Sequence, residues 1–95
     1  MVVGVVKLTL RIPENDSLKG KRRVVKQLIE RTRNRFEIAI NETGLLDNHR
    51  EAEVGLVCVG NDRRVVNSVL DRAISYVDSL GTALITDNVL EIINL

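Results

Sequence analysis

Two hydrophobic periods alternate along the chain, and their order is the strongest constraint on its fold. Apolar residues recur with a period of two in residues 2–12, 36–42, 52–60 and 83–94, a spacing typical of strands. Two intervening stretches, one starting at Leu18 and one ending near Leu80, repeat every three or four positions, as amphipathic helices do. The predicted order is therefore strand, helix, strand, strand, helix, strand.

This order predicts an α/β (α+β) ferredoxin-like fold over residues 1–95 as a single domain. Right-handed crossovers place both helices on the same face of a four-stranded antiparallel sheet. The first and third strands should be central, because residues 52–60 are apolar on both faces. The core must rely on Val, Ile and Leu, since the chain has one Phe, one Tyr and no Trp. The second sheet face should remain uncovered.

Several residues mark where the elements begin and end. Pro13 should end the first strand, and Asn15, Asp16 and Ser17 offer side-chain oxygens that can cap the first helix. Asn61 and Asp62 are expected to cap the second helix, with Gly81 at its C-terminus. Residues 43–51 form a predicted polar loop. Asp87-Asn88 interrupts the last strand, either as a bulge or as a tight turn that makes a hairpin.

The location of the protein follows from what the sequence lacks. No stretch approaches the roughly 20 apolar residues of a membrane span, and residues 1–6 are too short for a signal peptide. The one cysteine cannot form an internal disulfide. We therefore expect a soluble, cytoplasmic protein with no membrane partner.

Charge is unevenly distributed, although the formal net charge is only +1. Residues 1–36 hold ten Lys and Arg against three acids, whereas residues 37–95 hold four Arg against ten acids. A small domain polarised in this way can steer a charged partner.

The first helix carries the strongest functional signal. With residues placed 100° apart, Lys19, Arg22, Lys26 and Arg33 fall on one stripe, with Arg23 at its edge and Glu30 interrupting it. Such a stripe can follow a phosphate backbone. The predicted nucleic-acid or anion-binding residues are Lys19, Lys21, Arg22, Arg23, Lys26 and Arg33. The alternative is a solvated helix face, with Lys26 and Glu30 as a spaced ion pair.

Lys21 stands apart from this stripe, because its helical angle lies in the apolar sector with Leu18, Val25 and Leu28. Either the first turn overhangs the sheet edge or Lys21 snorkels across apolar surface. A third interpretation is that Lys21, Lys19, Arg22 and the free amides of the helix start hold an anion.

The uncovered sheet face is the second candidate surface. RNA-recognition domains stack bases on aromatic residues there, and none is available on these strands. An exposed valine patch is instead typical of self-association or partner binding, so we expect a homodimer. The predicted face consists of Val3, Val5, Lys7, Thr9, Arg11, Val57 and Val59.

The sequence predicts no catalytic residue, cofactor, metal site or small-molecule substrate. His49 lies in a loop with Asp47, but no nucleophile or second ligand is placed to join them. Cys58 alternates into the core, where a thiol is usually inert packing.

One run of residues resembles a known family. The run SLKGKRRVVKQLI over residues 17–29 is similar to the opening helix of the YlxP-like family of small bacterial proteins of unknown function. The stretches MVVG at residues 1–4, RNRF at residues 33–36 and ND at residues 61–62 agree with it. The resemblance implies a ferredoxin-like fold. In that family, the genes often neighbour those of translation and ribosome-maturation factors. Gly20 and His49 depart from the family pattern, which has a polar residue and often a tryptophan there.

Together these observations predict a non-enzymatic accessory protein that binds RNA or a ribonucleoprotein through its basic first helix. The alternative is a homodimeric protein–protein interaction module that uses the open sheet face.

Overall fold

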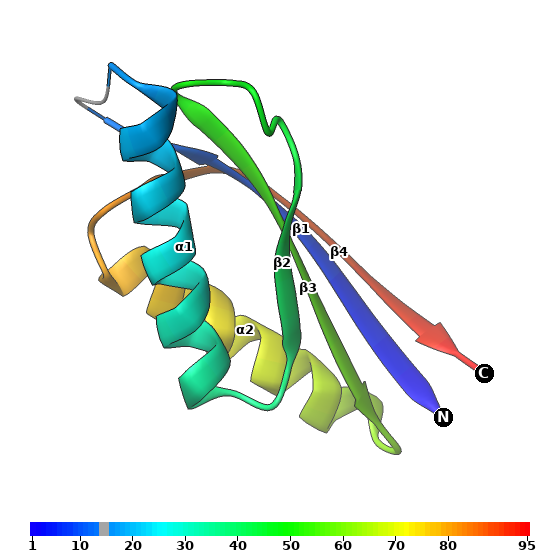
Figure 1. Cartoon of the computed structure of the whole chain (residues 1–95). Coiled ribbons are helices and arrows are strands. Elements are labelled where there is room, and N and C mark those ends of the chain that lie inside the picture. Colours follow the sequence, from blue (N-terminus) through cyan, green and yellow to red (C-terminus); the bar gives the residue numbers. More distant parts are fainter. Residues whose placement is uncertain (14–15) are drawn as a thin grey trace.

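Six elements follow the predicted order in the computed structural model, which describes residues 1–13 and 16–95 (Figure 1). They are β1 (Val2–Arg11), α1 (Leu18–Arg35), β2 (Ala39–Gly44), β3 (Glu51–Gly60), α2 (Arg63–Ser79) and β4 (Leu84–Asn94). The cap candidate Asn15 lies outside the described residues. The βαββαβ order confirms the ferredoxin-like prediction.

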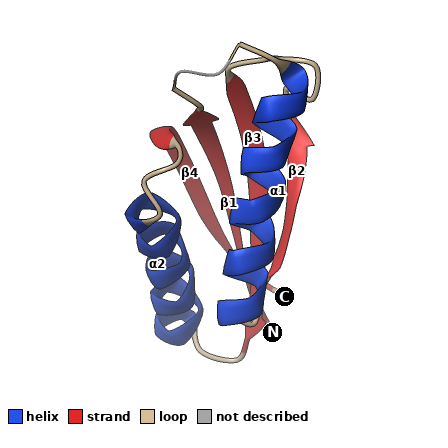
Figure 2. Cartoon of the chain, turned by 60° about the vertical axis from the view of Figure 1, so that its left-hand side comes forward, coloured by secondary structure: helices blue, strands red, loops and turns tan. Residues whose placement is uncertain are grey.

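The four strands form one antiparallel sheet in the order β2-β3-β1-β4, so β1 and β3 are central as predicted. Both helices cover the same face, and the other face is left open (Figure 2). The two termini lie side by side, because the backbone N–H of Leu95 donates to the carbonyl of Met1 at 2.8 Å. We call the uncovered side the open sheet face.

Both helices are capped as the sequence predicts. The Ser17 hydroxyl accepts a hydrogen bond from the Gly20 N–H at 3.0 Å. At the start of α2, Asp62 Oδ1 accepts from the Arg64 N–H at 2.8 Å. Gly81, with a φ of +69°, follows the C-cap Leu80 in the left-handed conformation that glycine adopts most readily.

The core lies between the sheet and the helices and consists almost entirely of aliphatic residues. Helix α2 packs directly on the backbone of β1 at Gly4, where a Cβ would lie only 2.5 Å from Leu70 Cδ1 and 2.7 Å from Val66 Cγ1. A side chain at residue 4 would therefore require the Leu70 and Val66 side chains of α2 to shift. The strands and helices contribute the buried apolar residues Val6, Leu8, Leu10, Val25, Leu28, Ile40, Val54, Leu56, Val66, Leu70 and Val77.

Phe36 does not begin the second strand, as its alternation with Ile38 had suggested. Its N–H bonds to the Thr32 carbonyl at 3.1 Å, so Phe36 is the C-cap of α1, and β2 begins only at Ala39. The Phe36 ring instead packs edge-on against Tyr76 of α2, with ring centroids 5.8 Å apart. Strand β2 extends to Gly44, so the following loop is shorter than the predicted one.

The last strand is one bulged strand and not a hairpin. Thr9 pairs with Asp87 and Leu10 pairs with Ile85, which leaves Thr86 as the extra residue. The Thr86 hydroxyl donates to the Thr9 carbonyl at 3.2 Å and so holds the bulge against β1. The bulge alternative is therefore confirmed.

Candidate functional site

Helix α1 divides into a buried side and a basic side. Its buried residues are Lys21, Val25, Leu28, Ile29 and Thr32, which face the sheet. Four exposed cations lie beside the buried side of the helix, and we call them the basic stripe: Lys19, Arg22, Arg23 and Lys26.

The basic stripe is almost unpaired within the described part of the chain. Its one ion pair joins Arg22 Nη2 to Asp47 Oδ1 at 3.9 Å, with side chains 60% and 97% exposed. A pair as open and long as this contributes little. Lys26 and Glu30 form no ion pair within 4.0 Å, so the spaced pair expected for a merely solvated face is not made. The charges of the stripe are therefore available to a partner.

Arg33 continues the stripe in sequence, but its guanidinium is engaged. Nη2 donates to the Ile40 carbonyl at 2.7 Å and lies 3.4 Å from Asn41 Oδ1. Arg33 therefore joins α1 to β2, and only part of its charge faces solvent.

Lys21 is a structural residue, which corrects the prediction that it helps to hold an anion. Its side chain is 0% exposed, and Nζ lies 2.8 Å from Glu42 Oε2. The same ammonium donates to the Leu45 carbonyl at 2.8 Å. A buried cation that is already paired offers no site to an external anion. Two features of the sequence pointed to this structural role. Lys21 lies in the apolar sector of the helix, and Glu42 continues the core-facing alternation of Ile38 and Ile40.

The open sheet face exposes the predicted valines. Val57 and Val5 pair across β3 and β1 and are each 36% exposed, while Val59 is 60% exposed. Val3 and Thr9 are half-buried, and Lys7 and Arg11 are exposed. The sequence reasoning missed Val89 and Ile93 of β4, which are 42% and 41% exposed on the same face. Their alternation with Leu90 and Ile92 was the available signal.

The β2 side of this face is hollowed. A cavity of about 300 Å³ is lined by residues that include Ala39, Asn41, Gly55 and Val57. The Thr43 side chain borders the hollow beside Gly55, where an added Cβ would lie 2.9 Å from Thr43 Cγ2. The hollow is lined by residues of β1, β2 and β3, and its lining includes no residue of β4.

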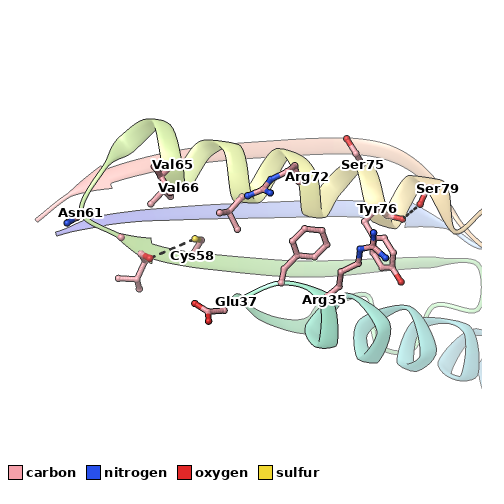
Figure 3. A pocket seen from close by; sticks show the side chains of 14 residues that line it. Arg35, Glu37, Cys58, Asn61, Val65, Val66, Arg72, Ser75, Tyr76 and Ser79 are labelled. Atoms are coloured by element: carbon pink, nitrogen blue, oxygen red, sulfur yellow. Dashed lines mark hydrogen bonds between the residues drawn. The ribbon is translucent and has the colours of Figure 1, made fainter.

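A second hollow lies between the two helices (Figure 3). It has a volume of about 820 Å³, with Cys58 of β3 on its floor and Arg72 on the α2 side. At one end the Arg35 guanidinium carbon lies 4.8 Å from the centroid of the Tyr76 ring, a cation–π contact. Sequence periodicity does not reveal this hollow, because its lining comes from the end of α1, the end of β3 and α2, which are separated in the sequence.

Cys58 is not placed for nucleophilic chemistry by its surroundings. The Cys58 side chain is 6% exposed, and burial, with a smaller contribution from the Glu37 charge, raises the pKa of its thiol above the ordinary value. Cys58 is therefore protonated at neutral pH. Asp47, the predicted companion of His49, extends toward Arg22.

In residues 1–13 and 16–95, no three His, Cys, Asp or Glu side chains gather closely enough to hold a metal ion. Neither helix in those residues is long and apolar enough to cross a membrane.

The fold and these two surfaces define a small ferredoxin-like α+β protein with one basic helix face and one open sheet face. The chain belongs to the family described as protein of unknown function (DUF503), whose model matches residues 3–89. It is similar to the Uncharacterized protein YlxP of Bacillus subtilis (strain 168), with 30% identity over 78 residues, 82% of this chain and 85% of that protein. The predicted YlxP-like resemblance is therefore confirmed.

Two solved structures share the fold. The structural-genomics protein YJCS aligns with a TM-score of 0.60 and 16% identity, covering 97% of this chain and 99% of that one. The de novo designed protein Foldit4 aligns with a TM-score of 0.52 and 15% identity, covering 100% and 99% of the two chains. At such low identity these likenesses establish the fold alone.

Proposed function

We propose that this protein is a non-enzymatic, cytoplasmic accessory factor that binds structured RNA, free or within a ribonucleoprotein, through the basic stripe. The observation that carries the proposal is the near absence of intramolecular partners for Lys19, Arg22, Arg23 and Lys26. A phosphate backbone can bind cations whose charge is not already neutralised by a neighbouring carboxylate.

The spacing of the stripe suits a nucleic-acid backbone. Lys19 and Lys26 are seven positions apart on α1, which corresponds to about 10 Å along the helix axis. Cations spread over this length can contact more than one phosphate of a nucleic-acid backbone. Contacts of this kind position a protein on a nucleic acid without reading its bases.

The remainder of the chain would orient this contact. Outside α1 and the residues before it, ten acids outnumber four Arg, so residues 37–95 repel a polyanion. The described open sheet face presents no aromatic side chain on which a base could stack. The partner is therefore recognised by its phosphates and shape rather than by base stacking.

Capture from native lysate tests this proposal. Tagged protein should retain RNA, and ribonuclease treatment should release both the RNA and any protein bound through it. In parallel, fluorescence anisotropy with a labelled hairpin RNA should give saturable binding at physiological salt. If no RNA is retained and the hairpin does not bind, the basic stripe is only a solvated helix face.

A second candidate function is a protein-interaction module that associates with itself through the open sheet face. The observation that favours it is the exposed apolar cluster of β1, β3 and β4, which includes Val57, Val59, Val89 and Ile93. Isolated exposed valines are ordinary, whereas a contiguous group on one flat face is typical of an interface. Sedimentation equilibrium should then show a dimer at micromolar concentration.

A further inference from the structure

We propose that the open sheet face pairs with a second copy of this chain about a two-fold axis parallel to the strands and midway between β1 and β3. This inference rests on the second candidate function and specifies the partner and its orientation. In the resulting dimer, β1 of each copy lies over β3 of the other, and β4 lies over β2.

The register of β1 and β3 supports this axis. A two-fold axis between the strands exchanges them, so each β1 residue faces its own β3 neighbour from the second copy. Opposing residues on the open sheet face are Val3 with Val59, Val5 with Val57, Lys7 with Gly55, Thr9 with Glu53 and Arg11 with Glu51.

Charge complementarity distinguishes this axis from the alternatives. At one end of the interface, valines face valines. At the other end, basic Arg11 faces acidic Glu51, and Glu53 lies between Lys7 and Arg11 of the second copy. A two-fold axis perpendicular to the strands would instead place the valine rows over the charged rows, which would desolvate charges against apolar side chains. Of these two axes, only the one parallel to the strands places valines over valines at the apolar end and opposite charges together at the polar end.

The shape of the face agrees with the same axis. Strand β4 carries Val89, Glu91 and Ile93, and it would lie over β2, whose Ala39 and Asn41 line the hollow of the second copy. Lys7 and Val89 share one row with Gly55 and Asn41, so they would project into the hollow of the second copy. A two-fold axis between β1 and β3 therefore brings β4, which does not line the hollow, over β2, which does.

The area of the open sheet face indicates how tightly the two copies should associate. Four strands about 4.8 Å apart, over roughly nine residues each, make a face of about 500–600 Å² per copy. The total of about 1,100 Å² lies at the low end for specific interfaces. We therefore expect a weak dimer, with a dissociation constant in the micromolar range.

Residues 39 and 91 provide the test of the geometry. Ala39, Val57, Val5 and Glu91 share one row, so Ala39 and Glu91 lie three strand spacings apart, about 14 Å, within one chain. At that separation, charges on one chain are largely screened at physiological salt. In the proposed dimer, however, Ala39 of each copy faces Glu91 of the other.

Ala39→Lys and Ala39→Glu form a matched pair of substitutions at the same exposed position. Sedimentation equilibrium should show that Ala39→Lys dimerises about tenfold more tightly than Ala39→Glu, because two symmetric charge pairs change sign together. In a Glu91→Lys background the order should invert. Circular dichroism should first establish that each variant is folded. If an Ala39 variant does not fold, the test can be repeated in the next row of the sheet. Asn41→Lys and Asn41→Glu are then compared in a Val89→Glu background.

The outcomes separate the two claims. A wild-type monomer at high concentration would overturn both the second candidate function and this geometry. A wild-type dimer whose Ala39 variants show no charge dependence, or no inversion with Glu91→Lys, would overturn the geometry alone. A tenfold difference that inverts supports the two-fold axis between β1 and β3.

Discussion

The ammonium group of Lys21, fully buried, lies 2.8 Å from Oε2 of Glu42 and joins helix α1 to strand β2. The same ammonium donates a hydrogen bond to the Leu45 carbonyl at 2.8 Å. Leu45 has a φ of +57°, an uncommon value for a residue other than glycine. Lys21 therefore fixes both the start of α1 and the turn that follows β2.

The first prediction concerns this pair. Glu42→Gln should lower the free energy of unfolding by about 2–4 kcal/mol, because it leaves the buried Lys21 charge uncompensated. The double variant Lys21→Met/Glu42→Leu should be more stable than Glu42→Gln, since apolar side chains replace both charges. Urea denaturation provides the measurement.

Asp47→Asn is the matched control, because it removes the exposed ion pair of Arg22. It should change the free energy of unfolding by less than about 0.5 kcal/mol. Equal losses for Glu42→Gln and Asp47→Asn would show that the buried pair has no special role.

The second prediction concerns the open sheet face. Val57→Lys should give a folded monomer, because two copies would bring like charges together near the two-fold axis. Val65→Lys is the control: Val65 is 58% exposed on α2, away from that face. Analytical ultracentrifugation should show that only Val57→Lys dissociates, and a dimer that tolerates Val57→Lys would place the interface elsewhere.

The third prediction concerns Cys58. Because burial raises the pKa of its thiol, iodoacetamide at pH 8 should alkylate the folded protein at least about tenfold more slowly than the urea-unfolded chain. Glu37→Gln should speed the reaction, since the Glu37 charge also raises this pKa. Equal rates for folded and unfolded chain would mean that Cys58 is accessible.

The same shift has a definite sign for stability. Below the ordinary thiol pKa both states are protonated, and the contribution of Cys58 does not change with pH. Above it the unfolded chain ionises first and binds fewer protons than the folded chain, so stability falls as pH rises. Between about pH 8 and 10, the free energy of unfolding should therefore fall less for Cys58→Ala than for the wild type.

The sequence was sufficient to predict the element order and the helix caps, because each depends on local chemistry. Period-two alternation is a local pattern. The three capping residues, Ser17, Asp62 and Gly81, also act within a few residues of their own positions. The open sheet face was also predictable on β1 and β3, since side chains alternate across a strand. Val89 and Ile93 were missed because the Asp87-Asn88 interruption obscured the phase of β4.

The features that escaped prediction depend on contacts between distant elements. Lys21 was recognised as anomalous from its helical angle, but its partner Glu42 lies across the α1–β2 connection and emerged only when both elements were placed. Phe36 was assigned to a strand because apolar alternation cannot distinguish a helix C-cap that packs on Tyr76. The hollow between the helices is likewise lined by residues from elements that are separated in the sequence.

Binding of the basic stripe to RNA is the central claim, and the salt dependence of affinity tests it most directly. The variant Lys19→Gln/Arg22→Gln/Lys26→Gln should flatten the slope of log affinity against log salt by about two to three units for a hairpin RNA. Its thermal stability should barely change, because the three side chains are exposed. The control Arg63→Gln/Arg64→Gln/Arg72→Gln makes the same change in net charge on α2 and should leave the slope nearly unchanged. If both triple variants lower the slope equally, net charge and not the stripe governs binding; if neither lowers it, the account is contradicted.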